Sequence, residues 1–147
     1  MQAVKVTAES WAKGFVIPGF PIPPINSFLG GKLVSHDPDN GVIRFSFPTK
    51  PEYANPASHV MGGITAAYLD NVPGPLTVAA TGGAAFPVSL DIHVTYFKPV
   101  PIGPDAIAEA RIDRMTKSVI FTTACILGDN DDILVRSIQS AMLRPTR

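Results

Sequence analysis

Hydrophobic and polar residues alternate along several short stretches of the chain, the pattern typical of strands with one buried face. In the clearest stretch, residues 87–97, we expect the core face to carry the apolar residues Leu90, Ile92, Val94 and Tyr96. The polar face there carries Ser89, Asp91, His93 and Thr95. Strands are predicted at residues 29–36, 42–47, 87–97, 106–115, 118–127 and 133–143. Because the last four follow one another closely, we expect an antiparallel meander.

The stretch between the second and third predicted strands, residues 55–74, has a helical period instead. Ile64, Tyr68 and Val72 recur every four residues, so they mark the buried face of a helix that begins near Gly63. Pro73 and the proline two residues later are expected to end or kink it, although residues 76–80 can add a further turn. Two strands, one helix and a run of strands predict an α+β domain whose sheet wraps around one long helix.

A second face of this helix carries three small residues and one acid, Gly63, Ala66, Ala67 and Asp70. Small residues leave space beside a helix, and Asp70 is the only charged residue between Glu52 and Asp91. This is how a helix borders a small-molecule cleft. The periodicity alone leaves an alternative open, in which the small residues pack closely on the sheet and Asp70 is solvated.

A glycine pair, Gly62 and Gly63, precedes or begins the predicted helix. Helix N-termini leave N–H groups unpaired, and with no Cβ in the way these groups can approach an oxygen atom closely. Gly62 and Asp70 lie eight residues apart, about 12 Å along a helix. One carbonyl group cannot contact both, so a site that uses both must combine two chains and requires an oligomer.

Composition restricts the remaining possibilities. The chain has 147 residues, of which 46% are hydrophobic and 16% charged, and its 12 basic and 12 acidic side chains cancel. No basic cluster interleaves with aromatic residues, which argues against a nucleic-acid partner. No apolar run approaches the roughly 20 residues of a membrane span and no signal pattern opens the chain, so we expect a cytoplasmic protein without membrane insertion. Cys125 is the only cysteine, and no metal site is expected.

The N-terminal residues precede the first predicted strand and have their own pattern. Residues 1–13 predict a short helix anchored by Trp11. Four prolines between Pro18 and Pro24 then predict an irregular surface loop, because proline lacks an N–H and fixes φ.

Four features together resemble the hotdog-fold acyl-CoA thioesterases, in particular the branch of the phenylacetate-degradation and 4-hydroxybenzoyl-CoA thioesterases. They are Asn55, the Gly62-Gly63 pair, Asp70 seven residues beyond Gly63, and the strand from Val88 to Pro99 followed by Gly103. The resemblance covers nearly all of the chain after Pro21. It implies a hotdog domain at residues 29–147, preceded by a helix and a proline-rich arm at residues 1–28.

The resemblance also implies an activity and an assembly. Asp70 would be the general base or nucleophile, the Gly62 N–H the oxyanion donor, Asn55 a group that positions water or the carbonyl, and Ser89 a helper from the strand. The site would lie at the interface of a homodimer, commonly paired into a homotetramer. The substrate would be an acyl-CoA, with coenzyme A as part of the substrate and no cofactor.

This sequence departs from the family's usual His-Gly-Gly at the helix start, because Met61 stands in the histidine position. His59, two residues earlier, is expected in a loop, with a role in the site as the alternative. The residues that we expect to bind substrate are Met61, Gly63, Ala66, His59, Lys117 and Arg114, the last two through the phosphates of the coenzyme. His93 has no role in the family pattern, and we interpret it as a structural or interface residue.

Two other functions remain open at this stage. A hotdog enoyl-CoA hydratase is suggested by Asn55-Pro56 followed by His59, although Tyr53 stands where the hydratase pattern has an aspartate and the histidine comes one residue late. A protein that binds acyl-CoA or a related lipid without turnover is suggested by Met61. Thioester hydrolysis is the leading hypothesis.

Overall fold

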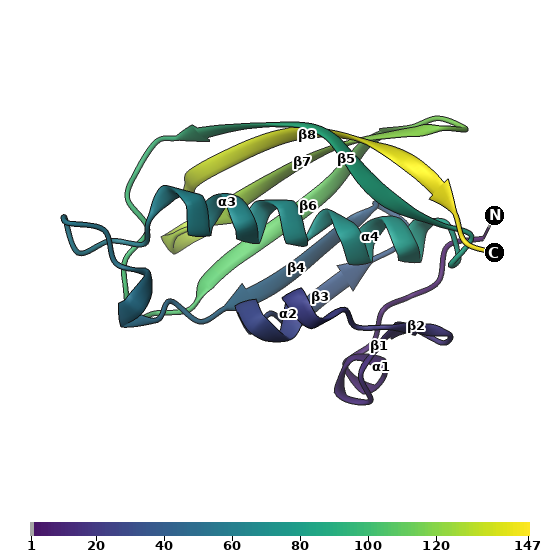
Figure 1. The fold of residues 1–147 in the computed structure, drawn as a ribbon, viewed down its shortest axis with the longest axis horizontal. Helices are drawn as coiled ribbons and strands as arrows, with labels where there is room; N and C mark the ends of the chain where they lie inside the picture. The colour runs from purple at the N-terminus through teal and green to yellow at the C-terminus, as the bar shows by residue number, and fades with distance from the viewer. Residues whose placement is uncertain (1) are drawn as a thin grey trace.

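A six-stranded antiparallel sheet curls around two consecutive helices in the computed structural model, which describes residues 2–147 (Figure 1). The strand order is β3-β4-β6-β7-β8-β5. The strands are β3 (Lys32–Asp37), β4 (Val42–Phe47), β5 (Ala85–Tyr96), β6 (Ala106–Met115), β7 (Val119–Leu127) and β8 (Ile133–Pro145). The predicted α+β architecture is confirmed.

The helices are α3 (Gly62–Asn71) and α4 (Pro73–Ala80), which follow each other in nearly the same direction (Figure 1). Val72 between them keeps right-handed helical angles, and Pro73 occupies the first position of α4, where a missing N–H costs least. The prolines therefore divide the helix without ending it. Short 3₁₀ turns lie at Pro51–Tyr53 and Asp129–Asp131.

The predicted buried face of the helix is confirmed. Tyr68 and Val72 have no exposed surface, and Ile64 is partly buried against the core. The ring of Tyr68 stacks on Phe47 with centroids 4.6 Å apart, and its hydroxyl donates to the Pro48 carbonyl at 2.9 Å. Burial raises the pKa of the Tyr68 hydroxyl, so the hydroxyl stays a hydrogen-bond donor.

The predicted core face of β5 is confirmed in part, because Ile92, Val94 and Tyr96 pair with buried residues of β8 and Val94 packs against the core. Leu90 and Tyr96 are nevertheless 58% and 51% exposed, and β5 is an edge strand whose only strand neighbour is β8. A β-bulge lies at Leu90, between Ser89 paired with Ala141 and Asp91 paired with Ser140. The extra residue changes which side chains face the helix, so the simple alternation does not hold along the whole strand.

The predicted four-strand meander is correct only for its last three strands. β6, β7 and β8 pair in sequence order, whereas β5 pairs with β8 at the far edge of the sheet. The connection from β5 to β6 contains Pro99, Pro101 and Pro104, and it crosses from one part of the sheet to another instead of forming a tight hairpin.

The N-terminal arm is more ordered than the predicted loop. It contains α1 (Ala8–Ala12), β1 (Phe15–Ile17), β2 (Phe20–Pro21) and α2 (Pro24–Leu29). Gly19, with φ of 86°, allows the tight turn between β1 and β2, and Pro24 begins α2. Leu29 therefore ends a helix instead of starting a strand. The predicted helix at residues 1–13 is confirmed as the shorter α1; Met1 lies outside the described residues.

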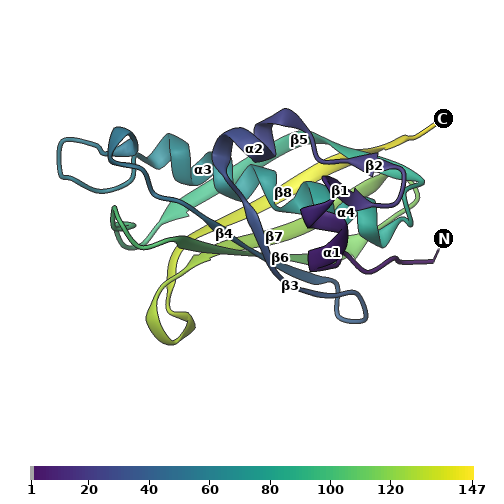
Figure 2. The same cartoon turned by 90° about the horizontal axis from the view of Figure 1, so that it is seen from below.

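The arm lies along one side of the domain (Figure 2), and hydrogen bonds of Val4, Trp11 and Val6 help to hold it there. The Val4 N–H donates to the Ala79 carbonyl at 2.9 Å. The Trp11 indole N–H donates to the Gly31 carbonyl at 3.2 Å, and its ring meets the edge of a core phenylalanine, so Trp11 is the expected anchor. The Val6 N–H donates to Nδ1 of the buried His36 at 2.8 Å.

Two further features bear on the expected chemistry. Cys125 is partly buried, and burial raises the pKa of its thiol, which disfavours the reactive thiolate. Among residues 2–147, no helix is long and apolar enough to cross a membrane.

Acid is expected to destabilise the protein through His36. Burial is the largest cause that lowers the pKa of His36 below its ordinary 6.5, with a contribution from Lys5. A lowered pKa means that the neutral ring stabilises the fold above about pH 6.5, and that this stabilisation is lost as the pH falls below that value. Protonation also removes the acceptor for the Val6 N–H. Urea unfolding of the wild type and of His36→Gln between pH 8 and pH 5 measures this effect. The wild type should lose more stability on acidification than the variant, and equal losses would contradict the assignment.

Candidate active site

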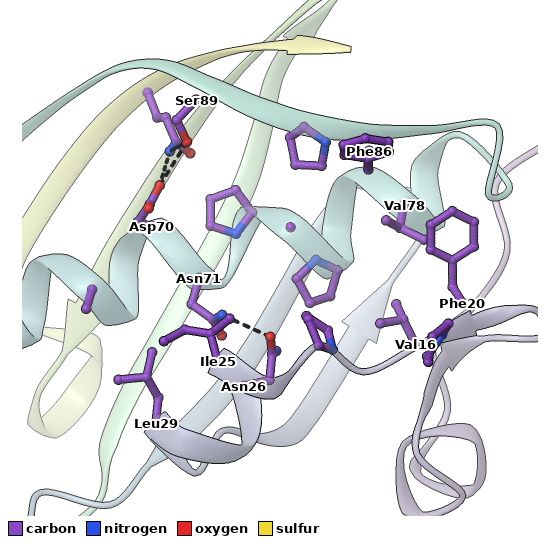
Figure 3. Close-up of a pocket in the computed structure, with 18 residues that line it drawn as sticks. Val16, Phe20, Ile25, Asn26, Leu29, Asp70, Asn71, Val78, Phe86 and Ser89 are labelled. Atoms are coloured by element: carbon purple, nitrogen blue, oxygen red, sulfur yellow. Dashed lines mark hydrogen bonds between the residues drawn. The ribbon is translucent and has the colours of Figure 1, made fainter. Parts of the chain in front are cut away.

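Asp70 lies near the end of α3, and its side chain points toward β5 and β8 (Figure 3). Its Oδ1 atom accepts two hydrogen bonds, from the Ser89 hydroxyl at 3.0 Å and from the Gln139 amide at 2.5 Å. The Gln139 amide also donates to the Ser89 hydroxyl oxygen at 2.9 Å. Oδ2 of Asp70 takes no hydrogen bond from any described residue. The cluster thus holds the carboxylate in place and leaves one oxygen available.

The bulge at Leu90 places Ser89 in this cluster. Ser89 pairs with the buried Ala141, so both side chains point to the helix side of the sheet. Gln139 occupies an inward position of β8 and is only 6% exposed. A buried amide is costly without partners, and Asp70 and Ser89 supply them.

Sequence reasoning missed Gln139, although a signal was present. The inward positions of β8 are Val135, Ser137, Gln139, Ala141 and Leu143. A long polar side chain in that alternation indicates a buried partner, which here is the carboxylate of Asp70.

A pocket of about 670 Å³ opens beside the Asp70 cluster. Asp70, Ser89 and Gln139 line one end of it, and Asn71 with Asn26 of α2 adds a second polar contact, at 3.1 Å between Nδ2 and Oδ1 (Figure 3). The rest of the lining is mainly apolar, from the arm, α4 and β5, and includes Val16, Phe20, Pro75, Val78, Phe86 and Pro87. The pocket therefore suits a ligand with an apolar body and one polar group.

The Gly62 end of α3 has the features of an oxyanion site. Gly62 is the first residue of the helix, and among residues 2–147 no acceptor takes the N–H of Gly62 or Gly63. The Gly62 carbonyl accepts from the Tyr96 hydroxyl at 2.6 Å and from the Thr65 hydroxyl at 2.8 Å, which orients this turn. The helix dipole adds partial positive charge at the same point.

Asn55 and His59 line a second pocket, of about 320 Å³, together with Gly62. Oδ1 of Asn55 accepts from the N–H groups of Ala57 and His59 at 3.0 and 3.1 Å, so this side chain shapes the loop before the helix. Its Nδ2 donates to none of the described residues. His59 lies in the loop as expected, and it shares the pocket with Gly62.

The remaining predicted residues lie outside these pockets. Met61 is half-exposed at the start of α3, and Gly63 and Ala66 line neither pocket. Arg114 and Lys117 are exposed at the β6–β7 hairpin, away from both. His93 pairs with Ile138 on the outer face of the sheet, and Lys98 lines the Gly62 pocket and pairs with Asp132 at 2.6 Å.

Within one chain, the predicted catalytic residues therefore form two groups. Asp70 and Ser89 border one pocket, Gly62 and Asn55 border the other, and no residue lines both. Gly62 and Asp70 remain about 12 Å apart along the helix, as the sequence predicted.

A curved antiparallel sheet wrapped around a central helix is the hotdog fold. A phenylacetic acid degradation-related protein from Ralstonia eutropha JMP134 has this architecture, with a TM-score of 0.78 and 22% identity over 86% of this chain and 95% of that one. A Streptococcus mutans protein bound to acetyl-CoA gives a TM-score of 0.70 and 13% identity over 80% and 90% of the two chains.

The sequence pattern of the thioesterase superfamily matches residues 57–134, more than half of the chain. The chain belongs to this superfamily. Human acyl-coenzyme A thioesterase 13 is 27% identical over 93 residues, which are 63% of this chain and 66% of that protein. The chain thus spans slightly less than two thirds of the length of this relative.

Proposed function

We propose that this protein hydrolyses acyl-CoA thioesters to a free acid and coenzyme A. The observation that carries the proposal is the Asp70 carboxylate at the polar end of an apolar pocket, with Oδ1 held by Ser89 and Gln139 and Oδ2 left available. Membership of the thioesterase superfamily supports this reaction, as does the likeness to acyl-coenzyme A thioesterase 13. The likeness to a protein that binds acetyl-CoA supports the substrate class.

The chemistry needs few groups. Oδ2 of Asp70 takes a proton from a water molecule as that water attacks the thioester carbon. In the alternative, Oδ2 itself attacks the carbon and displaces the thiolate, and water then hydrolyses the resulting anhydride, which releases the acid and restores the Asp70 carboxylate. The Gly62 N–H donates to the oxygen of the tetrahedral intermediate, an interaction worth about 3 kcal/mol in comparable sites. The carbon–sulfur bond then breaks, and the thiolate leaves readily because the pKa of a thiol is only about 8.5. No cofactor is required in this scheme, since coenzyme A belongs to the substrate.

The proposal requires two chains, with Asp70 of one and Gly62 of the other at each site. The rigid spacing within α3 supports this requirement, as does the edge strand β5. Val88, Leu90 and Ile92 on that strand are 37–58% exposed, an unusual apolar surface unless a second chain covers it. The family resemblance extends the proposal to a cytoplasmic homotetramer built from two such dimers.

The proposal extends to the remaining predicted residues. Asn55 and His59 lie in the pocket of Gly62, where they can contact the thioester carbonyl or the attacking water. Arg114 and Lys117 are exposed cations, and we assign them to the phosphates of coenzyme A in the assembled protein. Met61, Gly63 and Ala66 border the start of α3 and are assigned to substrate contacts across the interface.

Asp70→Asn is expected to abolish most thioester hydrolysis. Asparagine keeps an oxygen that accepts from Ser89 and Gln139, so the cluster is preserved while the base is lost. General-base catalysis typically contributes 10²–10⁴-fold, and kcat should fall by about that factor. Release of free thiol from short, medium and aryl acyl-CoAs measures the effect.

Asp113→Asn is the matched control. Asp113 is also exposed and accepts from a threonine hydroxyl, at 2.6 Å, but it lies on β6 and borders neither pocket. This variant should retain wild-type turnover. Equal turnover by the wild type and Asp70→Asn would refute the assignment of Asp70. Hydration of crotonyl-CoA without thiol release would indicate a hydratase, and saturable binding without turnover would indicate a binding protein.

Gly62→Pro is expected to remove the oxyanion donor without disrupting the helix. Proline is favoured at the first helical position, and Met61 before it already has φ of −56° and ψ of 139°, as residues before proline prefer. The Cβ would lie 3.1 Å from the ring of Tyr96, an exposed side chain that can shift. Losing the donor should lower kcat by about 10²–10³-fold.

Mixing Gly62→Pro with Asp70→Asn tests whether each site is shared. Neither variant alone has a complete site, but a mixed dimer has one site with native Gly62 from one chain and native Asp70 from the other. Denaturing and refolding the two variants together should therefore recover activity that neither shows alone. If chains exchange, as judged by differently tagged copies, and activity does not return, the site lies within one chain.

Gln139→Met is expected to lower kcat more than it raises KM. Methionine has a similar shape but donates no hydrogen bond, so Asp70 loses its shortest contact while the substrate pocket keeps its volume. Hydrogen bonds to charged groups are worth about 1.5–3 kcal/mol, which corresponds to roughly a 10–100-fold loss in rate. Steady-state kinetics with thermal melting separate this effect from unfolding. A folded variant with unchanged kcat would show that Gln139 does not position the carboxylate.

A further inference from the structure

The pocket beside Asp70 continues along the helix into an apolar region. Asp70, Gly74 and Val78 all line it, and they follow one another at four-residue intervals across α3 and α4. Residues at this spacing lie on one helix face, about 6 Å apart per step. The pocket therefore runs from the carboxylate past Gly74 to Val78, about 12 Å in all.

The polar and apolar groups of the pocket are separated along this direction. Figure 3 shows Asp70 and Ser89 at one end, and Phe20, Phe86 and Val78 around the other. A thioester whose carbonyl lies at Asp70 would thus place an apolar chain over Gly74 and between the two phenylalanine rings. The volume of about 670 Å³ is far more than an acetyl group fills.

Gly74 keeps the middle of the pocket open. A Cβ built on Gly74 meets no atom within 4 Å outside its chain neighbours, and the residue has no positive φ. The restriction on a side chain there comes from Pro75, because a proline disfavours helical angles at a preceding residue that carries a Cβ. Pro73 and Pro75 flank it within the lining and hold the backbone around it in one conformation. Any side chain at position 74 would project into the space that the acyl chain needs.

We propose that this pocket binds the acyl group, that it selects acyl chains of medium length, and that Gly74 determines the accepted length. The inference rests on the proposed thioester hydrolysis and adds its substrate class. Each methylene group that leaves water improves kcat/KM about fourfold, so octanoyl-CoA should exceed butyryl-CoA by at least about tenfold.

A size series at position 74 tests the inference. The variants Gly74→Ala, Gly74→Val and Gly74→Leu add progressively larger side chains, and all three share the restriction that Pro75 places on the preceding residue, so Gly74→Ala is the reference for the series. The ratio of kcat/KM for octanoyl-CoA to that for butyryl-CoA should fall in the order of side-chain size, by at least about tenfold for Gly74→Leu. A constant ratio across the series, or a wild type that prefers butyryl-CoA, would overturn the inference.

Phe86→Ala provides the opposite change. Phe86 is 41% exposed at the far end of the pocket, so its truncation lengthens the space and should move the preferred substrate from octanoyl-CoA toward decanoyl-CoA. An unchanged or shortened preference would contradict the proposed direction of the chain. Thermal melting confirms that each variant is folded.

Failure of this inference is distinguishable from failure of the proposed function. If the wild type hydrolyses butyryl-CoA and octanoyl-CoA equally well, the reaction stands and the acyl pocket is wrong. If it hydrolyses neither, calorimetric titration with octanoyl-CoA still tests the pocket. Binding that Gly74→Leu weakens at least tenfold supports the pocket, and equal or absent binding refutes it.

Discussion

The stacking of Tyr68 on Phe47 sets the rotation of the central helix on the sheet. The ring is completely buried, and its hydroxyl is satisfied by the Pro48 carbonyl, so the helix cannot turn about its axis without losing both contacts. Successive helical residues are about 100° apart, which places Asp70 on the side away from the ring of Tyr68. The acid therefore faces β5 and β8 because an aromatic residue two positions earlier faces the core.

Local periodicity was sufficient to predict the helix and much of the sheet. The buried face of Ile64, Tyr68 and Val72 is set by the helical repeat alone, and the predicted bounds of β4 and β6 agree with the structure. The family resemblance named Asp70 and Ser89 for one site, and the structure joins them by a hydrogen bond. These features were accessible because each depends on neighbours in sequence or on a motif with fixed spacing.

The features that sequence reasoning missed depend on pairing between distant segments. Nothing in residues 85–96 indicates that this strand pairs with β8, or that the bulge at Leu90 turns Ser89 toward the helix. The exposed Leu90 and Ile92 show a second difficulty. An apolar residue in an alternating pattern indicates that something covers it, but does not say whether its own chain or another does so. Gln139 was detectable in principle, as a polar residue at an inward position of β8.

Both groups of site residues contact the edge strand β5. Ser89 belongs to β5 itself, and Tyr96 of the same strand holds the Gly62 carbonyl at the helix start. One exposed strand therefore contacts both Asp70 and Gly62, the two ends of a rigid helix that cannot bring them together. A second chain paired along that strand would fix the acid and the glycine turn by the same contacts that form the interface. In the proposed dimer, the contacts that form the interface would therefore also fix the catalytic geometry, since a shift in strand register would move both groups.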